Sequence, residues 1–116
     1  MFNQRESKYG AKKTEVDGIV FDSKKEARYY QELKLMQKGK VVDKFEMQVA
    51  YVLQEGFRHP SCKRKVMPII YVADFVVHYA DGHTEVVDVK GYRTSEYILK
   101  KKLLLHQNPE MCFKEV

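Results

Sequence analysis

Two aspartates, Asp74 and Asp88, stand in apolar segments of the chain, and Lys90 follows the second by two positions. If the segment around Asp88 is a β-strand, Asp88 and Lys90 emerge on one face of its sheet, because successive side chains alternate between faces. Carboxylates gathered in this way can bind a divalent cation through their oxygens. The simpler alternative is two ordinary strand-end aspartates, since Asp-x-Lys is a common tripeptide. A catalytic trio is therefore the hypothesis that these residues raise.

The turn between the two strands decides whether Asp74 meets Asp88. If Ala80, Asp81 and Gly82 form a three-residue loop with Gly82 in the left-handed conformation, the two aspartates lie opposite each other. A two-residue Asp-Gly loop would shift the pairing by one residue and separate them onto opposite faces. The sequence alone allows both turns. Opposed aspartates repel unless a cation lies between them, so a metal site favours the three-residue loop.

Glu26 is a third carboxylate that could reach the same place. Ser23 and Glu26 form the capping-box pattern that begins a helix, and closing that box is a sufficient role for a glutamate. Tyr30 and Leu33 follow four and seven residues later, so Glu26 also lies on the core-facing side of the helix. Its carboxylate could reach the edge of the sheet, and both roles stay open on local grounds.

Hydrophobic periodicity and turn residues predict the elements that would position these side chains. We expect a hairpin at residues 15–21, a helix from Ser23 to about Lys38 ended by Gly39, and antiparallel strands at 41–57, 69–79 and 84–89. A second helix, capped by Thr94 or Ser95, runs to about residue 107. Residues 111–116 form a last strand, parallel to its neighbour through a right-handed crossover.

The predicted fold class is α/β in its α+β form, with a mixed central sheet flanked by helices. Residues 1–13 are expected to form a flexible basic arm, and residues 14–116 a single domain. Apolar side chains surround the axis of the second helix, which suggests burial against the sheet and against another surface, such as a second subunit. Gln48, on the first long strand, is a weaker site candidate whose alternative is a solvated polar residue.

Composition narrows the class of protein. The chain has 116 residues, of which 44% are hydrophobic and 32% charged, as in a globular domain. No apolar run could span a membrane and no signal peptide begins the chain, so we expect a cytoplasmic protein without a membrane partner. Cys62 and Cys112 stand alone and the histidines lack metal-ligand spacing, which argues against a zinc site.

Basic residues exceed acidic ones by 21 to 16, which gives a net charge of +5. They cluster in four runs that can hold phosphate groups, although lysine-rich surfaces are often merely solvated. At about 100° per residue, the three consecutive lysines of the second helix cannot share one face. The four runs are Lys12-Lys13, Lys24-Lys25, Lys63-Arg64-Lys65 and Lys100-Lys101-Lys102.

The order of elements, with Glu26 on the first helix and Asp74 and Asp88-Val89-Lys90 on the second and third long strands, resembles the PD-(D/E)XK phosphodiesterase superfamily. Within it, the chain is similar to small endonuclease-like proteins of phages and prophages. The segments that carry the resemblance are residues 8–14 (KYGAKKT), 21–27 (FDSKKEA), 71–75 (YVADF) and 88–91 (DVKG). Ala73 replaces the proline of the motif, an exchange common in the superfamily that removes no ligand.

This resemblance implies a restriction-endonuclease-like core and a Mg²⁺ or Mn²⁺ ion bound by Asp74, Asp88 and Glu26, with the Val89 carbonyl as a further ligand. Lys90 would orient the attacking water and stabilise charge, and no small-molecule cofactor would be needed. The implied function is a phage-type endodeoxyribonuclease of the bacterial cytoplasm, with branched or structured DNA as a candidate substrate and a homodimer as its form. The expected DNA contacts are Lys12, Lys13, Lys24, Lys25, Lys63, Arg64, Lys65, Arg93, Lys100 and Lys102.

Two other functions remain open. The same fold could serve as a catalytically inactive DNA-binding module in phage replication or packaging. Intact Asp74, Asp88 and Lys90 argue against it, because a pure binder does not need carboxylates that repel phosphate. A metal-free RNA-binding protein would need stacking aromatics on an open sheet face, and no ribonucleoprotein-type motif accompanies Tyr51 and Tyr71.

Overall fold

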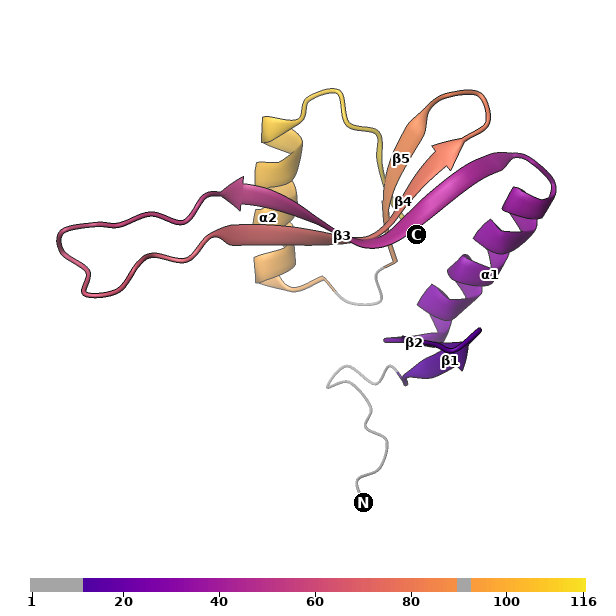
Figure 1. Cartoon of the computed structure of the whole chain (residues 1–116), viewed down its shortest axis with the longest axis horizontal. Helices are drawn as coiled ribbons and strands as arrows, with labels where there is room; N and C mark the ends of the chain where they lie inside the picture. Colours follow the sequence, from indigo (N-terminus) through magenta and orange to yellow (C-terminus); the bar gives the residue numbers. More distant parts are fainter. Residues whose placement is uncertain (1–11, 90–92) are drawn as a thin grey trace, which may run out of the picture.

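The computed structural model describes residues 12–89 and 93–116. A short hairpin, β1 (Thr14–Val16) and β2 (Ile19–Phe21), precedes helix α1 (Lys24–Lys38). The main sheet has the strand order β3-β4-β5-β6, formed by β3 (Val42–Gln54), β4 (Ile69–Tyr79), β5 (Thr84–Asp88) and β6 (Phe113–Glu115). Helix α2 (Ser95–Gln107) connects β5 to β6, which pair in parallel, whereas the other pairs are antiparallel. The chain therefore has an α+β fold with a mixed central sheet and two helices, as predicted (Figure 1).

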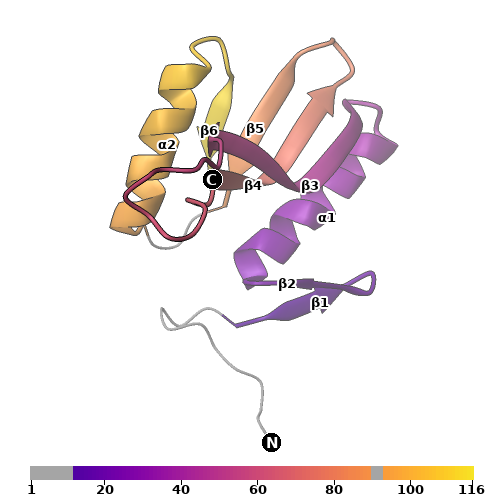
Figure 2. The ribbon, with the colours of Figure 1, turned by 60° about the vertical axis from the view of Figure 1, so that its left-hand side comes forward.

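The two helices cover opposite faces of the main sheet (Figure 2). The α1-side core includes Leu33 of α1 with Phe75, Val77 and Val87 of the sheet. The α2-side core is centred on Leu104, which packs with sheet residues of the other face: Leu53, Tyr71, Ala73, Val76 and Val86. Burial of these side chains on both faces fixes the positions of the strands that carry Asp74 and Asp88.

Helix α1 begins as its sequence predicts, because the Ser23 side chain accepts a hydrogen bond from the Glu26 N–H at 3.1 Å. The Glu26 carboxylate does not complete a capping box with the Ser23 N–H; it accepts from the Asp22 N–H at 3.3 Å. The helix ends at Lys38, and Gly39 caps it with an ordinary φ of −82°. The left-handed residue of this turn is Lys40, with φ of 65°.

The loop between β4 and β5 is the three-residue loop that we predicted. The Tyr79 N–H donates to the His83 carbonyl at 2.9 Å, the Gly82 N–H donates to the Tyr79 carbonyl at 3.0 Å, and Gly82 has φ of 101°. The register that follows pairs Phe75 with Val87, which places Asp74 and Asp88 at the next opposed position. A two-residue turn is therefore excluded.

Strands β3 and β4 both change face at one level of the sheet. Met47 and Phe75, which are paired, pack in the α1-side core, whereas the paired residues Val49 and Ala73 pack in the α2-side core. Residues two apart on a regular strand share a face, so each strand must turn over between these pairs. The residue on β3 at this level is Gln48, whose φ of 55° lies in the left-handed region. The residue opposite it on β4 is Asp74.

Helix α2 packs on the sheet along one side only. Leu104 is fully buried, while Ile98 and Leu99 are 42% and 59% exposed. No helix in the described part of the chain is long and apolar enough to cross a membrane. Two predictions concern residues outside the described ranges, namely the N-terminal arm up to residue 11 and Lys90.

Candidate active site

Glu26 lies at the start of α1 and is 6% exposed. Its Oε1 accepts from the Asp22 N–H at 3.3 Å, and its Oε2 accepts from Gln48 Nε2 at 3.4 Å. Burial, followed by the charge of Asp74 and a hydrogen bond to it, raises the pKa of Glu26 to about 8. A pKa of about 8 favours a protonated Glu26 carboxyl at neutral pH, as expected for a buried acid next to a second acid.

Asp74 connects Glu26 to the end of β5. Its Oδ2 accepts a hydrogen bond from the Val89 N–H at 2.8 Å, and its own N–H donates to Asp88 Oδ1 at 3.2 Å. Asp88 is fully buried. These bonds confirm the predicted pairing of Asp74 with Asp88.

The three carboxylates do not form one compact group. Val87 and Val89 lie in the α1-side core and Val86 in the α2-side core, so alternation directs Asp88 toward α2. The pKa of the Tyr97 hydroxyl on α2 is raised first by its burial, next by its hydrogen bond to Glu115, and then by the charge of Asp88. Glu26 reaches Asp74 from α1. Asp74 thus stands between two acids that approach it from different helices.

The arrangement of these carboxylates shows which metal ions they could bind. Within residues 12–89 and 93–116, no group of three or more His, Cys, Asp or Glu side chains has the geometry to hold a metal ion. The Glu26–Asp74 pair nevertheless fits Mg²⁺, which commonly uses one or two carboxylates and keeps several waters. Their oxygens are hard ligands, and a cation bound between them would relieve the repulsion that contributes to the raised pKa of Glu26.

Gln48, the weaker site candidate from the sequence, contacts the acid pair in the structure. It lies opposite Asp74, its amide contacts Glu26, and its backbone adopts a left-handed conformation that costs a non-glycine residue on the order of 1 kcal/mol or more. Such strain persists where the surrounding structure requires it. The weak signal in the sequence was a polar residue in the middle of a long alternating strand.

The cations expected to contact DNA differ in how far they are neutralised. Lys13 binds Asp22 at 3.0 Å, Lys100 binds Glu96 at 3.0 Å, and Arg93 binds Glu115 at 2.7 Å. Lys12 and Lys25 also have interactions. Lys24, Lys63, Arg64, Lys65 and Lys102 make no hydrogen bond or ion pair with the described residues. The basic residues between β3 and β4 are therefore the most available for an anionic partner.

Glu115 anchors the far side of the site. It lies beside Asp88 in the parallel β5–β6 pair and accepts hydrogen bonds from Arg93, Tyr97 and Lys101. These bonds, led by that of Arg93, lower the pKa of Glu115 to about 2. The network ties the start of α2 to the strand next to Asp88, so it holds the end of β5 in place.

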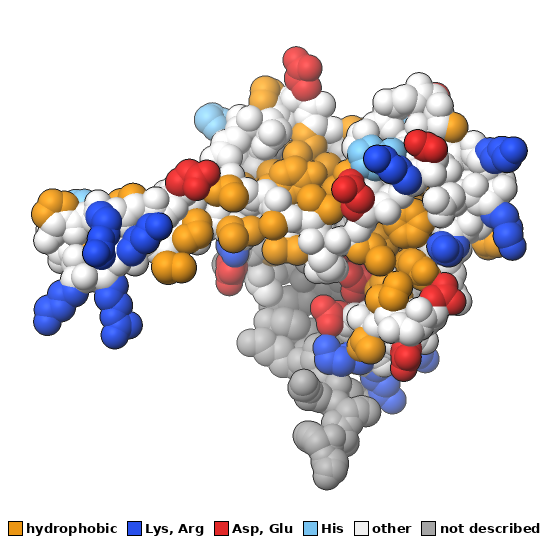
Figure 3. Space-filling view, viewed as in Figure 1, with side chains coloured by type: hydrophobic (Ala, Val, Ile, Leu, Met, Phe, Trp, Pro, Cys, Tyr) orange, Lys and Arg blue, Asp and Glu red, His pale blue; other side chains and the backbone are white. Residues whose placement is uncertain are grey.

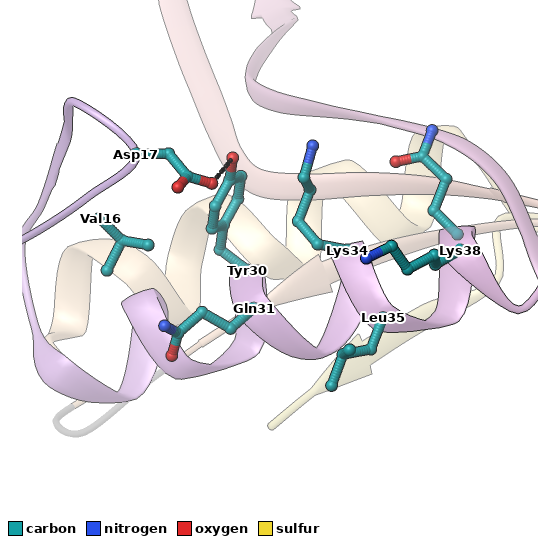
Figure 4. Close-up of a pocket in the computed structure, with 8 residues that line it drawn as sticks. Val16, Asp17, Tyr30, Gln31, Lys34, Leu35 and Lys38 are labelled. Carbon is teal, nitrogen blue, oxygen red and sulfur yellow. Dashed lines mark hydrogen bonds between the residues drawn. The ribbon is translucent and has the colours of Figure 1, made fainter.

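A hollow of about 640 Å³ lies between the β1–β2 hairpin and α1 (Figure 4). The Tyr30 hydroxyl donates to Asp17 Oδ2 at 2.9 Å on its wall, and Lys34 and Leu35 also line it. Glu26 and Asp74 are not among the residues that line this hollow. We assign the candidate chemistry to the carboxylates instead, because they combine burial with a perturbed pKa.

Comparison with known proteins gives one match. No curated protein and no solved structure matches the chain significantly. A family model described as "Protein of unknown function (DUF1064)" matches residues 6–116. This match covers nearly the whole chain, which therefore belongs to the DUF1064 family.

Proposed function

We propose that this protein is a metal-dependent endodeoxyribonuclease that hydrolyses DNA phosphodiester bonds on a restriction-endonuclease-like core. The observation that carries the proposal is the buried Glu26 carboxyl, which is hydrogen-bonded to Asp74 beside Asp88 at the point where the sheet bends. Burying adjacent acids lowers stability, so their presence at one place favours a role in binding a cation.

Glu26 and Asp74 are the residues that would hold Mg²⁺ or Mn²⁺, with Asp88 next to them and the Val89 carbonyl as a further ligand. When bound, the ion would polarise a phosphate oxygen and lower the pKa of a bound water. Occupation of the site requires Glu26 to give up its proton, and because the pKa of Glu26 is raised to about 8, the affinity for metal should increase as pH rises toward that value. Gln48 orients the Glu26 carboxylate through its amide. Lys90 is proposed to orient the attacking water and to stabilise negative charge.

DNA is the proposed partner because unpaired cations lie outside the site and can contact phosphates on either side of the scissile bond. Branched or otherwise structured DNA is the proposed substrate class. A homodimer would supply two sites for two strands, and the exposed Ile98 and Leu99 of α2 are candidates for its interface. The alternative is a DNA-binding accessory module without catalysis. Such a module would gain stability from losing the buried acids.

The test is cleavage of supercoiled plasmid and of a four-way junction with Mg²⁺, Mn²⁺ or chelator. Wild type should cut only with metal, while Asp88→Asn and Glu26→Gln should bind DNA without cutting it. Thermal melting separates loss of function from loss of fold. Glu26→Gln is the better control for folding, because glutamine keeps the size and neutral charge of the protonated Glu26. Uncut DNA with wild type under all metal conditions would refute the proposal.

A further inference from the structure

Strands β3 and β4 continue beyond Gln48 and Asp74 and pass α2, and the loop that joins them then projects from the body of the molecule as an arm (Figure 1). Their pairing runs to Gln54 and Ile69, and a further bridge joins Phe57 to Val66. At its base the arm is held to α2, because Gln107 Nε2 donates to the Leu53 carbonyl at 2.7 Å. The arm is therefore an extension of the strand that carries Asp74.

The tip of the arm, residues 56–66, has a defined shape. Two backbone hydrogen bonds of 2.9 and 2.7 Å close it between Phe57 and Val66. A further bond of 2.9 Å runs from the Cys62 N–H to the His59 carbonyl. At Gly56, a Cβ atom would lie 3.0 Å from the Val66 carbonyl oxygen, so only glycine fits there without a shift of the backbone. These contacts give the backbone of the tip a defined path, which keeps its side chains near one another.

The tip presents four exposed cations, Arg58, Lys63, Arg64 and Lys65. None of them forms an ion pair or hydrogen bond with a residue that the structure describes. Lys and Arg side chains accordingly gather at the end of the arm in Figure 3. Since like charges held together repel each other, an anionic partner would stabilise this arrangement. A nucleic-acid backbone supplies one negative charge per 3.4 Å of each strand.

The length of the arm sets the distance between its tip and the site. Eight residues separate Asp74 from Val66 along the strand direction. At about 3.3 Å per residue this corresponds to about 26 Å, or about 8 base pairs of B-form DNA.

We propose that the tip binds the phosphate backbone of a DNA duplex about 8 base pairs from the bond that is cleaved. This inference rests on the proposed nuclease function and adds a requirement to it: the substrate must extend as duplex for that length on one side. DNA is favoured over an acidic protein because the arm extends from the strand that carries Asp74, and one duplex can reach both Asp74 and the tip.

Binding tests the proposal independently of cleavage. The variant Lys63→Gln/Arg64→Gln/Lys65→Gln is compared with Lys34→Gln/Lys38→Gln/Lys114→Gln, which removes the same charge from exposed positions away from the arm. Fluorescence anisotropy measures the affinity for a 30-base-pair duplex with chelator, at 50 to 200 mM salt. The tip variant should lose at least about tenfold in affinity, and its salt slope should fall by about 2.7. Equal losses in both variants, or no loss in the tip variant, would overturn the proposal.

Cleavage tests the distance. Four-way junctions with arms of 4, 8, 12 and 16 base pairs, each closed by a stable hairpin loop, are cut with Mg²⁺ or Mn²⁺. Wild type should cut poorly when the arms are shorter than about 8 base pairs, and the tip variant should cut all lengths at the same low rate. Equal cutting of all lengths by wild type would overturn the role of the tip and leave the nuclease function intact. No cutting of any substrate by wild type would refute the nuclease function. The anisotropy comparison would still test whether the tip binds DNA.

Discussion

The substitution Glu26→Gln gives a quantitative test of the buried acid pair. Glu26 has an ordinary pKa of 4.5 in the unfolded chain and about 8 in the fold. Between these values the folded state binds one more proton than the unfolded state, so its stability falls as pH rises from 4.5 to 8. At 1.36 kcal/mol per unit, the cost at pH 7 is at most about 3.4 kcal/mol.

Glutamine cannot ionise and can still donate to Asp74, so the variant should escape this cost. We expect Glu26→Gln to match wild type in free energy of unfolding near pH 4.5 and to become the more stable protein as pH approaches 8. Mg²⁺ should narrow the difference at pH 8 by stabilising wild type alone, by about 1.4 kcal/mol at ten times its Kd. Urea unfolding at pH 4.5, 7 and 8, with and without Mg²⁺, measures these effects. A pH-independent difference between the two proteins would refute the raised pKa of Glu26.

Three further substitutions test other parts of the site. Gln48→Gly should keep or raise the unfolding free energy, because glycine accepts the left-handed backbone. It should also reduce cleavage, because Glu26 loses its amide partner. Gln48→Ala is the control that removes the amide and keeps the backbone strain. Glu115→Gln should lower the unfolding free energy by about 1 to 2 kcal/mol at pH 7, and the difference should shrink as pH falls from 4.5 toward 2, as urea unfolding would show. Lys90→Ala should keep DNA and metal binding but lose most cleavage, and loss of metal binding would contradict its assigned role.

Local signals in the sequence predict most of this fold. Ser23 and Thr94 cap the helices that follow them, and the bounds of α1, β4 and α2 agree with the patterns of capping residues, alternation and prolines. The opposition of Asp74 and Asp88 follows from one turn, because Gly82 accepts the backbone that a three-residue loop requires. Such features depend on a few neighbouring residues, which is why the sequence alone could predict them.

The bend at Gln48 could not be predicted in this way. Apolar residues recur at every second position of β3 from Phe45 to Leu53, so the alternation continues unbroken through a point where the strand changes face. The change is visible only in which core each side chain joins. The neutralisation of Arg93 by Glu115 is similarly hidden, since 22 residues separate the two. The separation of Glu26 and Asp88 onto different sides of Asp74 follows from this long-range packing.

The most direct test of the central claim is the rate at which wild type and Asp74→Asn nick supercoiled plasmid in the same buffer, with Mg²⁺ or with chelator. Asp74 is the acid that contacts both Glu26 and the end of β5, so its loss should disable any metal bound there. We predict Mg²⁺-dependent nicking by wild type and none by the folded variant. Equal nicking by both proteins would contradict the assignment of Asp74, and no nicking by wild type would contradict the nuclease itself.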